Sequence, residues 1–187
     1  MLYILPTDTC FGLACAITDY KNYDKIYKIK KRPYEKALAI LVEDFNWLEK
    51  YADLNKEQID FLKNYEKPFT VLADSTYVLI WLNFADEETW DEFRNRSIYK
   101  KIWFRVANNK YEKKLVKDNG PMFLTSANIT DKKEIYTIEE IKQEFWDYIK
   151  KWIIKFLWAE DWDLIVTPPS EIFEFEWDSI NQNFIRK

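Results

Sequence analysis

Histidine is absent from this chain of 187 residues, and cysteine occurs only twice. The lack of histidine excludes catalytic dyads and triads built on an imidazole base, and it excludes most zinc sites. Cys10 and Cys15 are too few for a disulfide framework, so we expect reduced thiols in a cytoplasmic protein. No apolar run reaches the roughly 18 residues of a membrane-spanning helix, and the first residues lack the pattern of a signal peptide. We therefore expect no membrane partner.

Glycine is almost as scarce. Gly12 and Gly120 are the only two, whereas average usage predicts about 13 in a chain of this length. Tryptophan occurs nine times, and the two residue types together come to eleven, close to an ordinary glycine count. One hypothesis is that many of the nine are glycine in the living cell, because a reassigned codon was translated with the wrong table. The alternative is a protein that uses many indole rings for core packing.

The charge balance is slightly acidic, with 28 Lys and Arg against 32 Asp and Glu and a net charge of −4. This balance argues against a general nucleic-acid binder, whose surface needs a basic excess. A chain of this length can bury a core without help from disulfides or metals. No repeat, low-complexity tract or linker divides it, so residues 1–187 are predicted to form a single domain.

Short apolar runs alternate with segments of helical periodicity along the chain. The apolar runs predict strands at 2–5, 37–42, 69–72, 77–82, 102–106, 122–125, 153–157, 164–166 and 172–175. The periodic segments predict helices at 20–31, 46–51, 55–65, 110–117 and 137–148. Asn55 is a candidate N-cap, and Thr137 with Glu140 predicts a capping box. Strands that alternate with helices imply an α/β domain around one mixed sheet.

Polar clusters stand where the predicted strands begin or end, which is where α/β proteins place ligands. The five clusters are Pro6–Thr9, Lys30–Lys36, Arg105, Thr125–Asn128 and Pro168–Glu171. Each cluster alone has a simple structural explanation as a turn, a helix cap, a solvated charge run or an extended loop. Only their combination points to a function.

In this order and at this spacing, the clusters resemble one family, the YrdC/Sua5 family of threonylcarbamoyl-AMP synthases. The matching strings are Pro6–Leu13, Lys30–Lys36, Phe104–Val106, Thr125–Asn128, Pro169–Glu171 and Ile185–Arg186. The resemblance covers nearly the whole chain and matches the short form of the family, without an extra C-terminal domain. It implies a YrdC-like twisted mixed β-sheet with flanking helices and a concave basic cavity.

The resemblance also implies an activity. Family members act as nucleotidyltransferases that join L-threonine, bicarbonate and ATP into L-threonylcarbamoyladenylate and release pyrophosphate. A carbamate oxygen attacks the α-phosphorus of ATP, and positioning with charge neutralisation can drive that step without a histidine. The product serves the threonylcarbamoyladenosine modification of tRNA next to the anticodon. The implied partners are therefore a downstream threonylcarbamoyl-transferase complex and a weakly bound tRNA.

The matching positions carry implied roles. The catalytic residues would be Lys30, Arg32 and Ser126. The ATP-binding residues would be Lys30, Arg32, Lys36, Asn128 and Arg186. All except Asn128 are cations, which suit a triphosphate. The threonine-binding residues would be Thr7, Arg105, Ser126 and Ser170. Arg105 is the natural partner of a carboxylate. Mg²⁺ is expected to arrive with ATP, and no metal site of the protein itself is expected.

The chain departs from the family pattern in several places. Segment 66–70 keeps only the second proline and the threonine of a Pro-Gly-Pro-x-Thr block, and Ala107 replaces a proline. Thr130 and Asp131 stand where Ser-Gly is common. The helix that usually precedes the first strand is missing, which leaves the completeness of the N-terminus open. Tryptophan stands where the family tends to have glycine at Trp103, Trp146, Trp158, Trp162 and Trp177. Glycine permits a positive φ and a close backbone approach, which an indole does not.

Two other functions remain open. One is a carbamoyl-handling YrdC-like domain, as found inside hydrogenase-maturation proteins, although those domains belong to longer, cysteine-rich chains. The other is a non-catalytic RNA-binding module that uses the positive stripe Lys25–Lys36. Tight, salt-sensitive binding of tRNA without ATP turnover would favour the RNA-binding module.

Overall fold

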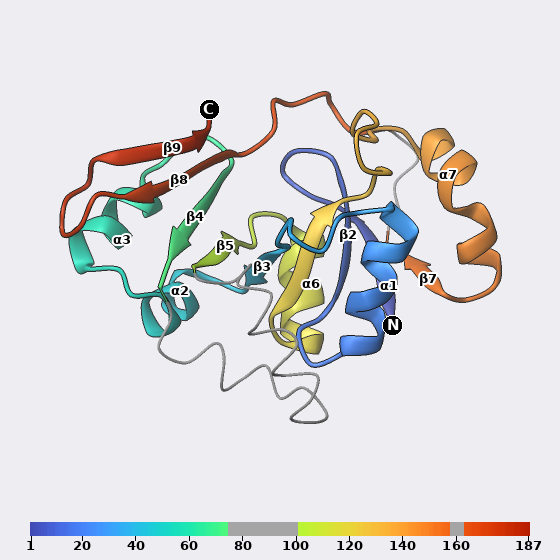
Figure 1. Cartoon of the computed structure of the whole chain (residues 1–187), viewed down its shortest axis with the longest axis horizontal. Coiled ribbons are helices and arrows are strands. Elements are labelled where there is room, and N and C mark those ends of the chain that lie inside the picture. The colour runs from blue at the N-terminus through green and yellow to red at the C-terminus, as the bar shows by residue number, and fades with distance from the viewer. Residues whose placement is uncertain (75–100, 158–162) are drawn as a thin grey trace.

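In the part of the chain that the structure describes, nine strands form one mixed sheet at the centre of the fold (Figure 1). The computed structural model describes residues 1–74, 101–157 and 163–187. The strands are β1 Leu2–Pro6, β2 Phe11–Ala16, β3 Ala39–Val42, β4 Phe69–Ala73, β5 Ile102–Val106, β6 Met122–Ser126, β7 Ile154–Phe156, β8 Glu171–Phe175 and β9 Gln182–Arg186. Their order in the sheet is β7-β1-β2-β6-β3-β5-β4-β8-β9.

Five helices flank the sheet in the described residues: α1 Tyr20–Lys30, α2 Phe45–Tyr51, α3 Lys56–Lys63, α6 Lys110–Asn119 and α7 Ile138–Lys150. Each helix begins after a side chain that accepts from its first backbone N–H groups, which have no partner within the helix. Asn55, Asn109 and Thr137 form complete capping boxes with the residue three positions further on. The predicted cap at Asn55 and the predicted box of Thr137 with Glu140 are confirmed.

Apolar side chains fill both faces of the sheet. One cluster joins the strands to α1, α2, α3 and α7, with Ile26, Leu48, Ile59 and Phe145 as helix members. The second cluster joins the other face to Leu115 and Val116 of α6. Neighbouring strand residues alternate between the two clusters, because successive side chains of a strand point to opposite faces: Ile40 belongs to the first and Leu41 to the second. The middle of the sheet, formed by β1, β2, β6 and β3, is thus buried on both sides.

The sheet topology brings distant polar clusters together. β1 and β2 form an antiparallel hairpin, and β2 pairs with β6 so that Gly12 lies opposite Ser126. β6 pairs with β3, and β3 runs parallel to β5, which carries Arg105. β4 then links β5 to β8. In Figure 1, residues 163–170 run along the top of the view from the α7 side to β8.

Most of the predicted elements are present in the described residues. The strand predicted at 164–166 is wrong, because Leu164 N donates to the carbonyl oxygen of Tyr136 (2.8 Å), which ties the segment to a loop. Ile165 and Val166 are consequently 87% and 73% exposed. β2 was not predicted, because its small and apolar residues around Gly12 show no alternation. The strand predicted at 77–82 lies outside the described residues.

None of the helices in the described ranges has the length and apolar character needed to cross a membrane.

Candidate active site

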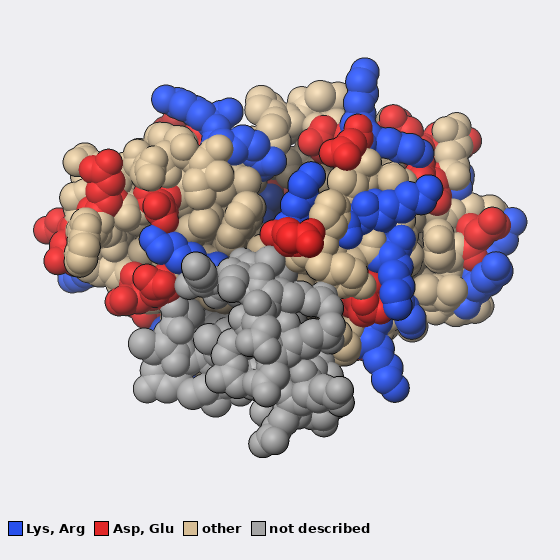
Figure 2. All heavy atoms as spheres, viewed as in Figure 1, with Lys and Arg blue, Asp and Glu red and all other residues tan. Residues whose placement is uncertain are grey.

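A pocket of about 160 Å³ lies where the β1–β2 turn, the turn after β6 and the segment before β8 meet. Its polar lining residues are Thr7, Thr9, Arg32, Thr70, Arg105, Thr125, Ser126, Glu134, Tyr136, Ser170 and Arg186. Figure 2 shows Lys and Arg side chains around a hollow near the middle of the molecule. The cavity is concave and carries three guanidinium groups, as the resemblance implied.

The hydroxyl of Thr7 organises the turn between β1 and β2. It donates to the carbonyl oxygen of Cys10 (2.8 Å) and accepts from the backbone N–H groups of Thr9 (3.2 Å) and Cys10 (3.3 Å). Thr7 therefore lines the pocket while its hydroxyl is engaged within the turn. A Cβ added at Gly12 on β2 would lie 2.8 Å from both Thr7 Cγ2 and Leu124 Cδ1, so this close approach requires glycine.

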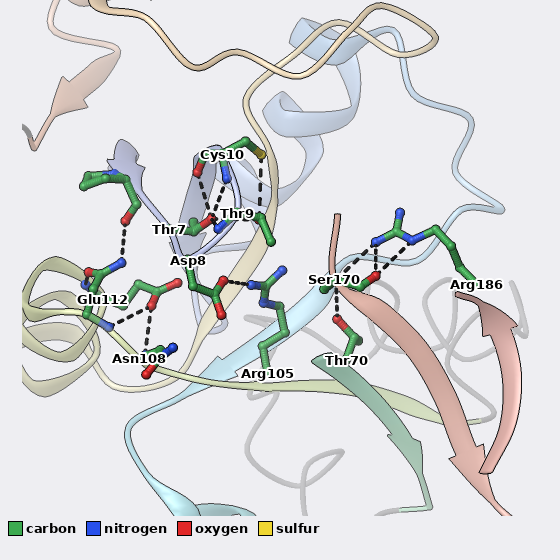
Figure 3. A network of polar contacts seen from close by, with 12 residues as sticks. Thr7, Asp8, Thr9, Cys10, Thr70, Arg105, Asn108, Glu112, Ser170 and Arg186 are labelled. Carbon is green, nitrogen blue, oxygen red and sulfur yellow. Dashed lines mark hydrogen bonds and ion pairs between the residues drawn. The ribbon is translucent and has the colours of Figure 1, made fainter. Parts of the chain in front are cut away.

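Arg105 reaches the pocket from β5. Its Nη2 donates to Oδ1 of Asp8 in the β1–β2 turn, and the two side chains are only 11% and 15% exposed. Behind them lies Glu112 of α6, whose Oε2 accepts from the backbone N–H groups of Asn108 (2.9 Å) and Asn109 (3.2 Å). Figure 3 shows Asp8 between Glu112 and the guanidinium group of Arg105. Burial raises the pKa of Glu112 to about 7, although the nearby Arg105 acts in the opposite direction.

Lys30 lies beneath the turn at 126–128 rather than in the pocket. It is 1% exposed, and its ammonium group donates to the carbonyl oxygens of Ser126 and Asn128 and to Asn128 Oδ1 (3.3 Å). The Ser126 hydroxyl, which lines the pocket, donates to the same Oδ1 (2.5 Å). Burial, followed by the neighbouring Arg32, lowers the pKa of Lys30 to about 7, whereas the three oxygen acceptors favour its charged form. Lys30 and Asn128 thus hold the turn that presents Ser126.

Arg32 and Lys36 come from one charged segment but have different surroundings. Arg32 lines the pocket, and its Nε and Nη2 donate to the carbonyl oxygens of Lys36 (2.9 Å) and Ala37 (2.7 Å). These two bonds fix the guanidinium plane. The Lys36 side chain is 53% exposed and its Nζ lies 3.8 Å from Asp131 Oδ1, outside the pocket lining.

The guanidinium group of Arg186 on β9 is hydrogen-bonded to Ser170, the residue before β8 (Figure 3). Its Nε and Nη2 donate to the carbonyl oxygen of Ser170 (3.1 and 2.8 Å), and Nη2 also donates to the Ser170 hydroxyl (3.1 Å). That hydroxyl lies 3.3 Å from Thr70 Oγ1 on β4. Burial, and next the positive charge of Arg105, lower the pKa of Arg186. The positive charges of Arg105 and Arg186 therefore act on each other within one pocket.

An anion therefore suits this pocket. Arg32, Arg105 and Arg186 come from three separate segments and line one cavity, and Glu134 is the one carboxylate among its described lining residues. Such a set can bind carboxylate and phosphate groups and stabilise charge that develops on phosphorus.

The structure brings six of the sequence-implied site residues to the pocket lining: Thr7, Arg32, Arg105, Ser126, Ser170 and Arg186. It leaves Lys30, Lys36 and Asn128 outside the lining. Sequence reasoning missed Glu134 and Tyr136, which sit in a loop that carries no recognisable pattern. Thr70 belongs to the weakened block at 66–70, which was the one signal that could have pointed to it.

The described part of the chain contains no group of three or more metal-ligating side chains placed to hold a metal ion. Three guanidinium groups and one carboxylate do not fit a resident Mg²⁺, which prefers several oxygen ligands. A larger cavity of about 750 Å³ lies beside α3 and β8. Five carboxylates line it, and they would repel phosphate: Asp53, Asp74, Glu174, Glu176 and Asp178.

Comparison with known proteins decides the family. A family profile named for Sua5, YciO and YrdC, described as telomere recombination, matches residues 1–157. The chain belongs to the Sua5/YciO/YrdC family. Among its relatives, the threonylcarbamoyl-AMP synthase of Pseudoalteromonas translucida (strain TAC 125) is 27% identical over 147 residues, which cover 78% of this chain and 74% of the relative. The protein of the same name from Serratia proteamaculans (strain 568) is 26% identical over 141 residues, which cover 75% and 70% of the two chains.

Several solved structures share the fold of this chain. P. abyssi Sua5 complexed with L-threonine superposes with a TM-score of 0.71 at 20% identity, over 94% of this chain and 48% of that chain. E. coli YciO gives a TM-score of 0.70 at 20% identity, over 100% and 82% of the two chains. T. kodakarensis HypF gives 0.73 at 16% identity, over 100% and 22%. The predicted YrdC-like α/β fold is confirmed.

Proposed function

We propose that this chain is an L-threonylcarbamoyladenylate synthase, which condenses L-threonine, bicarbonate and ATP and releases pyrophosphate. The observation that carries the proposal is the pocket in which Arg32, Arg105 and Arg186 converge beside Ser126. The segments that supply these residues are those that resemble the family motifs. Relatives that match 75–78% of the chain are named threonylcarbamoyl-AMP synthase, which supports the same reaction here.

Threonine binding is assigned to the Arg105 side of the pocket. A guanidinium group offers paired N–H donors to a carboxylate, and the Asp8 contact leaves further donors of Arg105 for the substrate. Thr7 and Ser170 line the same cavity. A related fold solved with L-threonine, P. abyssi Sua5, supports an amino acid as the ligand.

ATP binding and the chemical step are assigned to Arg32, Arg186 and Ser126. The threonine amine first forms a bond to the carbon of bicarbonate, a C–O bond breaks, and water leaves, which gives N-carboxythreonine. A carbamate oxygen of N-carboxythreonine then forms a bond to the α-phosphorus, the bond from that phosphorus to the bridging oxygen breaks, and pyrophosphate leaves with the electron pair. Arg32 and Arg186 neutralise charge on the phosphate oxygens during this transfer. Lys30 contributes indirectly, because its hydrogen bonds hold the turn that carries Ser126. Mg²⁺ enters as part of the ATP substrate.

The product is a reactive adenylate, so a second protein must take it up. We assign that step to a threonylcarbamoyl-transferase complex that modifies tRNA next to the anticodon, in the cytoplasm where tRNA and ATP are present. A weak contact between this chain and tRNA is compatible with its net charge of −4.

A second candidate function comes from the likeness to HypF. HypF shares the fold of this chain, and the alternative that the sequence left open is a carbamoyl-handling YrdC-like domain. The two functions differ in substrate, because the synthase requires L-threonine and bicarbonate, whereas the alternative requires a ready-made carbamoyl group.

Pyrophosphate release from ATP tests the proposal. We expect release that requires both L-threonine and bicarbonate, and we expect Arg32→Ala and Ser126→Ala to abolish it. Lys113→Ala on the surface of α6 is the matched control and should leave the rate unchanged. Pyrophosphate release that requires a carbamoyl compound instead of threonine would refute the synthase function and support the carbamoyl-handling alternative. Tight tRNA binding without any release would favour an RNA-binding module.

A further inference from the structure

The contact between Asp8 and Arg105 lies on the side of the guanidinium group away from the pocket. Arg105 is among the lining residues and Asp8 is not, although the two side chains form a hydrogen-bonded ion pair. Figure 3 shows the Asp8 carboxylate facing Arg105 from the Glu112 side, with Ser170 and Arg186 on the other side. One nitrogen of Arg105 is thus held, and the remaining donors are available to a ligand.

Asp8 is itself fixed by the fold. It lies in the turn that the Thr7 hydroxyl closes through its bonds to Thr9 and Cys10. Asn109, the N-cap of α6, donates from Nδ2 to the Pro6 carbonyl oxygen (3.1 Å) and ties this turn to the helix. A carboxylate anchored in this way can hold a partner guanidinium group in one orientation.

Asp8 also changes the charge of the site. Arg105 and Arg186 line the same cavity, and the positive charge of Arg105 is one cause of the lowered pKa of Arg186. The carboxylate of Asp8 partly neutralises Arg105 and reduces that repulsion. Without Asp8, the pocket would be more positive overall, but its threonine side would lose a fixed donor geometry.

We propose that Asp8 is a positioning residue for substrate recognition: it orients Arg105 so that the guanidinium group receives the carboxylate of threonine. This proposal rests on the proposed function. It predicts a selective effect, because Asp8 acts on the threonine side of the pocket while ATP is held by Arg32 and Arg186. A residue that merely stabilised the fold would affect both substrates equally.

The test is the Asp8→Asn variant, which keeps the size of the side chain and removes its charge. We expect the KM for threonine to rise about tenfold or more, as for the loss of a charge-assisted hydrogen bond, while the KM for ATP stays the same or falls. Asp8→Glu should recover part of the threonine affinity. Equal changes in both KM values, or no change in either, would overturn the proposal.

A double-mutant cycle keeps the proposal testable if single variants lose stability. If Asp8 acts through Arg105, then Asp8→Asn should weaken threonine binding little further in an Arg105→Ala background. Calorimetric binding of threonine supplies a readout that does not need turnover. Wild-type protein that turns over no threonine refutes the proposed function, whereas turnover with an unaffected Asp8→Asn variant refutes only the role of Asp8.

A second inference rests on backbone geometry at two tryptophans. Trp152 follows α7 with φ 57°, Trp152 N donates to Ile149 O (3.0 Å) and Ile153 N donates to Tyr148 O (2.9 Å). These two bonds define a Schellman motif, in which the left-handed residue is usually glycine. A bulky residue in this region is an outlier, and the indole of Trp152 gains no packing because the residue is 83% exposed.

Trp177 repeats the pattern in the turn between β8 and β9. Its φ is 47°, and Ser179 N donates to Glu176 O (3.1 Å), so Trp177 is the second residue of a four-residue turn. A positive φ at that position is ordinarily taken by glycine, asparagine or aspartate. Trp177 is 95% exposed.

We infer that residues 152 and 177 are glycine in the protein as its own cells make it. Trp47 and Trp103 are different, because neither has a positive φ and both pack on the core. The ring of Trp47 also lies tilted against that of Tyr51, with centroids 4.6 Å apart. Trp158 and Trp162 lie outside the described residues.

Peptide masses of protein purified from its own cells test this inference. We expect the peptides that span residues 152 and 177 to carry glycine, and tryptophan in both would overturn it. In the chain as written, Trp152→Gly and Trp177→Gly should each raise Tm by about 2–4 °C. Trp47→Gly is the matched control and should lower Tm. A fall in Tm for both variants would likewise count against the inference.

Discussion

The ammonium group of Lys30 donates a hydrogen bond to the carbonyl oxygen of Ser126, a residue 96 positions further along the chain. The same group also bonds to both the carbonyl and the side-chain oxygen of Asn128. Through these contacts the end of α1 braces the turn that ends β6. The pocket wall that carries the Ser126 hydroxyl therefore depends on a buried lysine that does not itself line the pocket.

Replacement of Lys30 tests whether its hydrogen bonds hold the turn that ends β6. Lys30→Met leaves the oxygens of the turn without their donor, so we expect a loss of roughly 1–3 kcal/mol in the free energy of unfolding, and at least about a tenfold fall in kcat. Denaturant unfolding and pyrophosphate release measure the two effects. Lys36→Met is the control for stability, because Lys36 is exposed, and it should change the free energy of unfolding by less than about 0.5 kcal/mol. Wild-type stability and kcat in Lys30→Met would contradict the account.

Glu112 predicts a pH dependence of stability. Its pKa rises from an ordinary 4.5 to about 7 in the folded protein, because the side chain is buried, and its Oε1 has no hydrogen-bond partner among the described residues. Between these two values the folded state binds a proton that the unfolded state has released. The contribution of Glu112 to the free energy of unfolding is therefore fully present below about pH 4.5 and is lost as pH rises through about 7, by roughly 3 kcal/mol.

Glu112→Gln keeps the capping box and removes the titration. We expect the unfolding free energy of the variant, relative to wild type, to rise between pH 5 and about pH 8 as the wild-type carboxyl loses its proton. Urea unfolding at a series of pH values measures the difference, and other titrating groups cancel in the comparison. Parallel curves for the two proteins would show that Glu112 does not titrate in this range.

The two glycines predict different outcomes on substitution. Gly12→Ala places a Cβ 2.8 Å from Thr7 Cγ2 and Leu124 Cδ1, so we expect a loss of about 1–3 kcal/mol and a disturbed β1–β2 turn, with lower activity. At Gly120, φ is 77° and ψ is −169°, a backbone conformation that is essentially restricted to glycine, and no atom lies within 4 Å of a new Cβ. Gly120→Ala should therefore cost about 1–3 kcal/mol through backbone strain alone and leave activity unchanged. Thermal unfolding and pyrophosphate release separate the two. Equal activity losses would argue against a special role for the close approach at Gly12.

Local signals in the sequence predicted much of the fold. The capping box of Thr137 with Glu140 and the apolar run that became β3 depend on neighbouring residues, and both are present. The strand expected at 164–166 failed because an apolar triplet does not specify a partner, and the Leu164 backbone bonded to a loop instead. β2 was not predicted, because Gly12 and its small neighbours show no alternation of apolar and polar residues. Its pairing with β1 and β6 makes this segment a strand.

The site was predictable in composition but not in arrangement. Arg32, Arg105 and Arg186 were named from short motifs, and the sheet order brings them to one pocket. The burial of Lys30 and the pairing of Asp8 with Arg105 could not be predicted, because both join segments about a hundred residues apart. Their partners are fixed by strand register, which the motifs do not encode.

The central claim is that this chain forms the adenylate itself, and isotope incorporation tests it most directly. Purified protein is incubated with ATP, L-threonine and ¹³C-bicarbonate, and the products are analysed by mass spectrometry. The account predicts a threonine-dependent adenylate whose mass carries the labelled carbon, formed in step with pyrophosphate. Pyrophosphate without a labelled adenylate, or an adenylate that lacks the label, would contradict it.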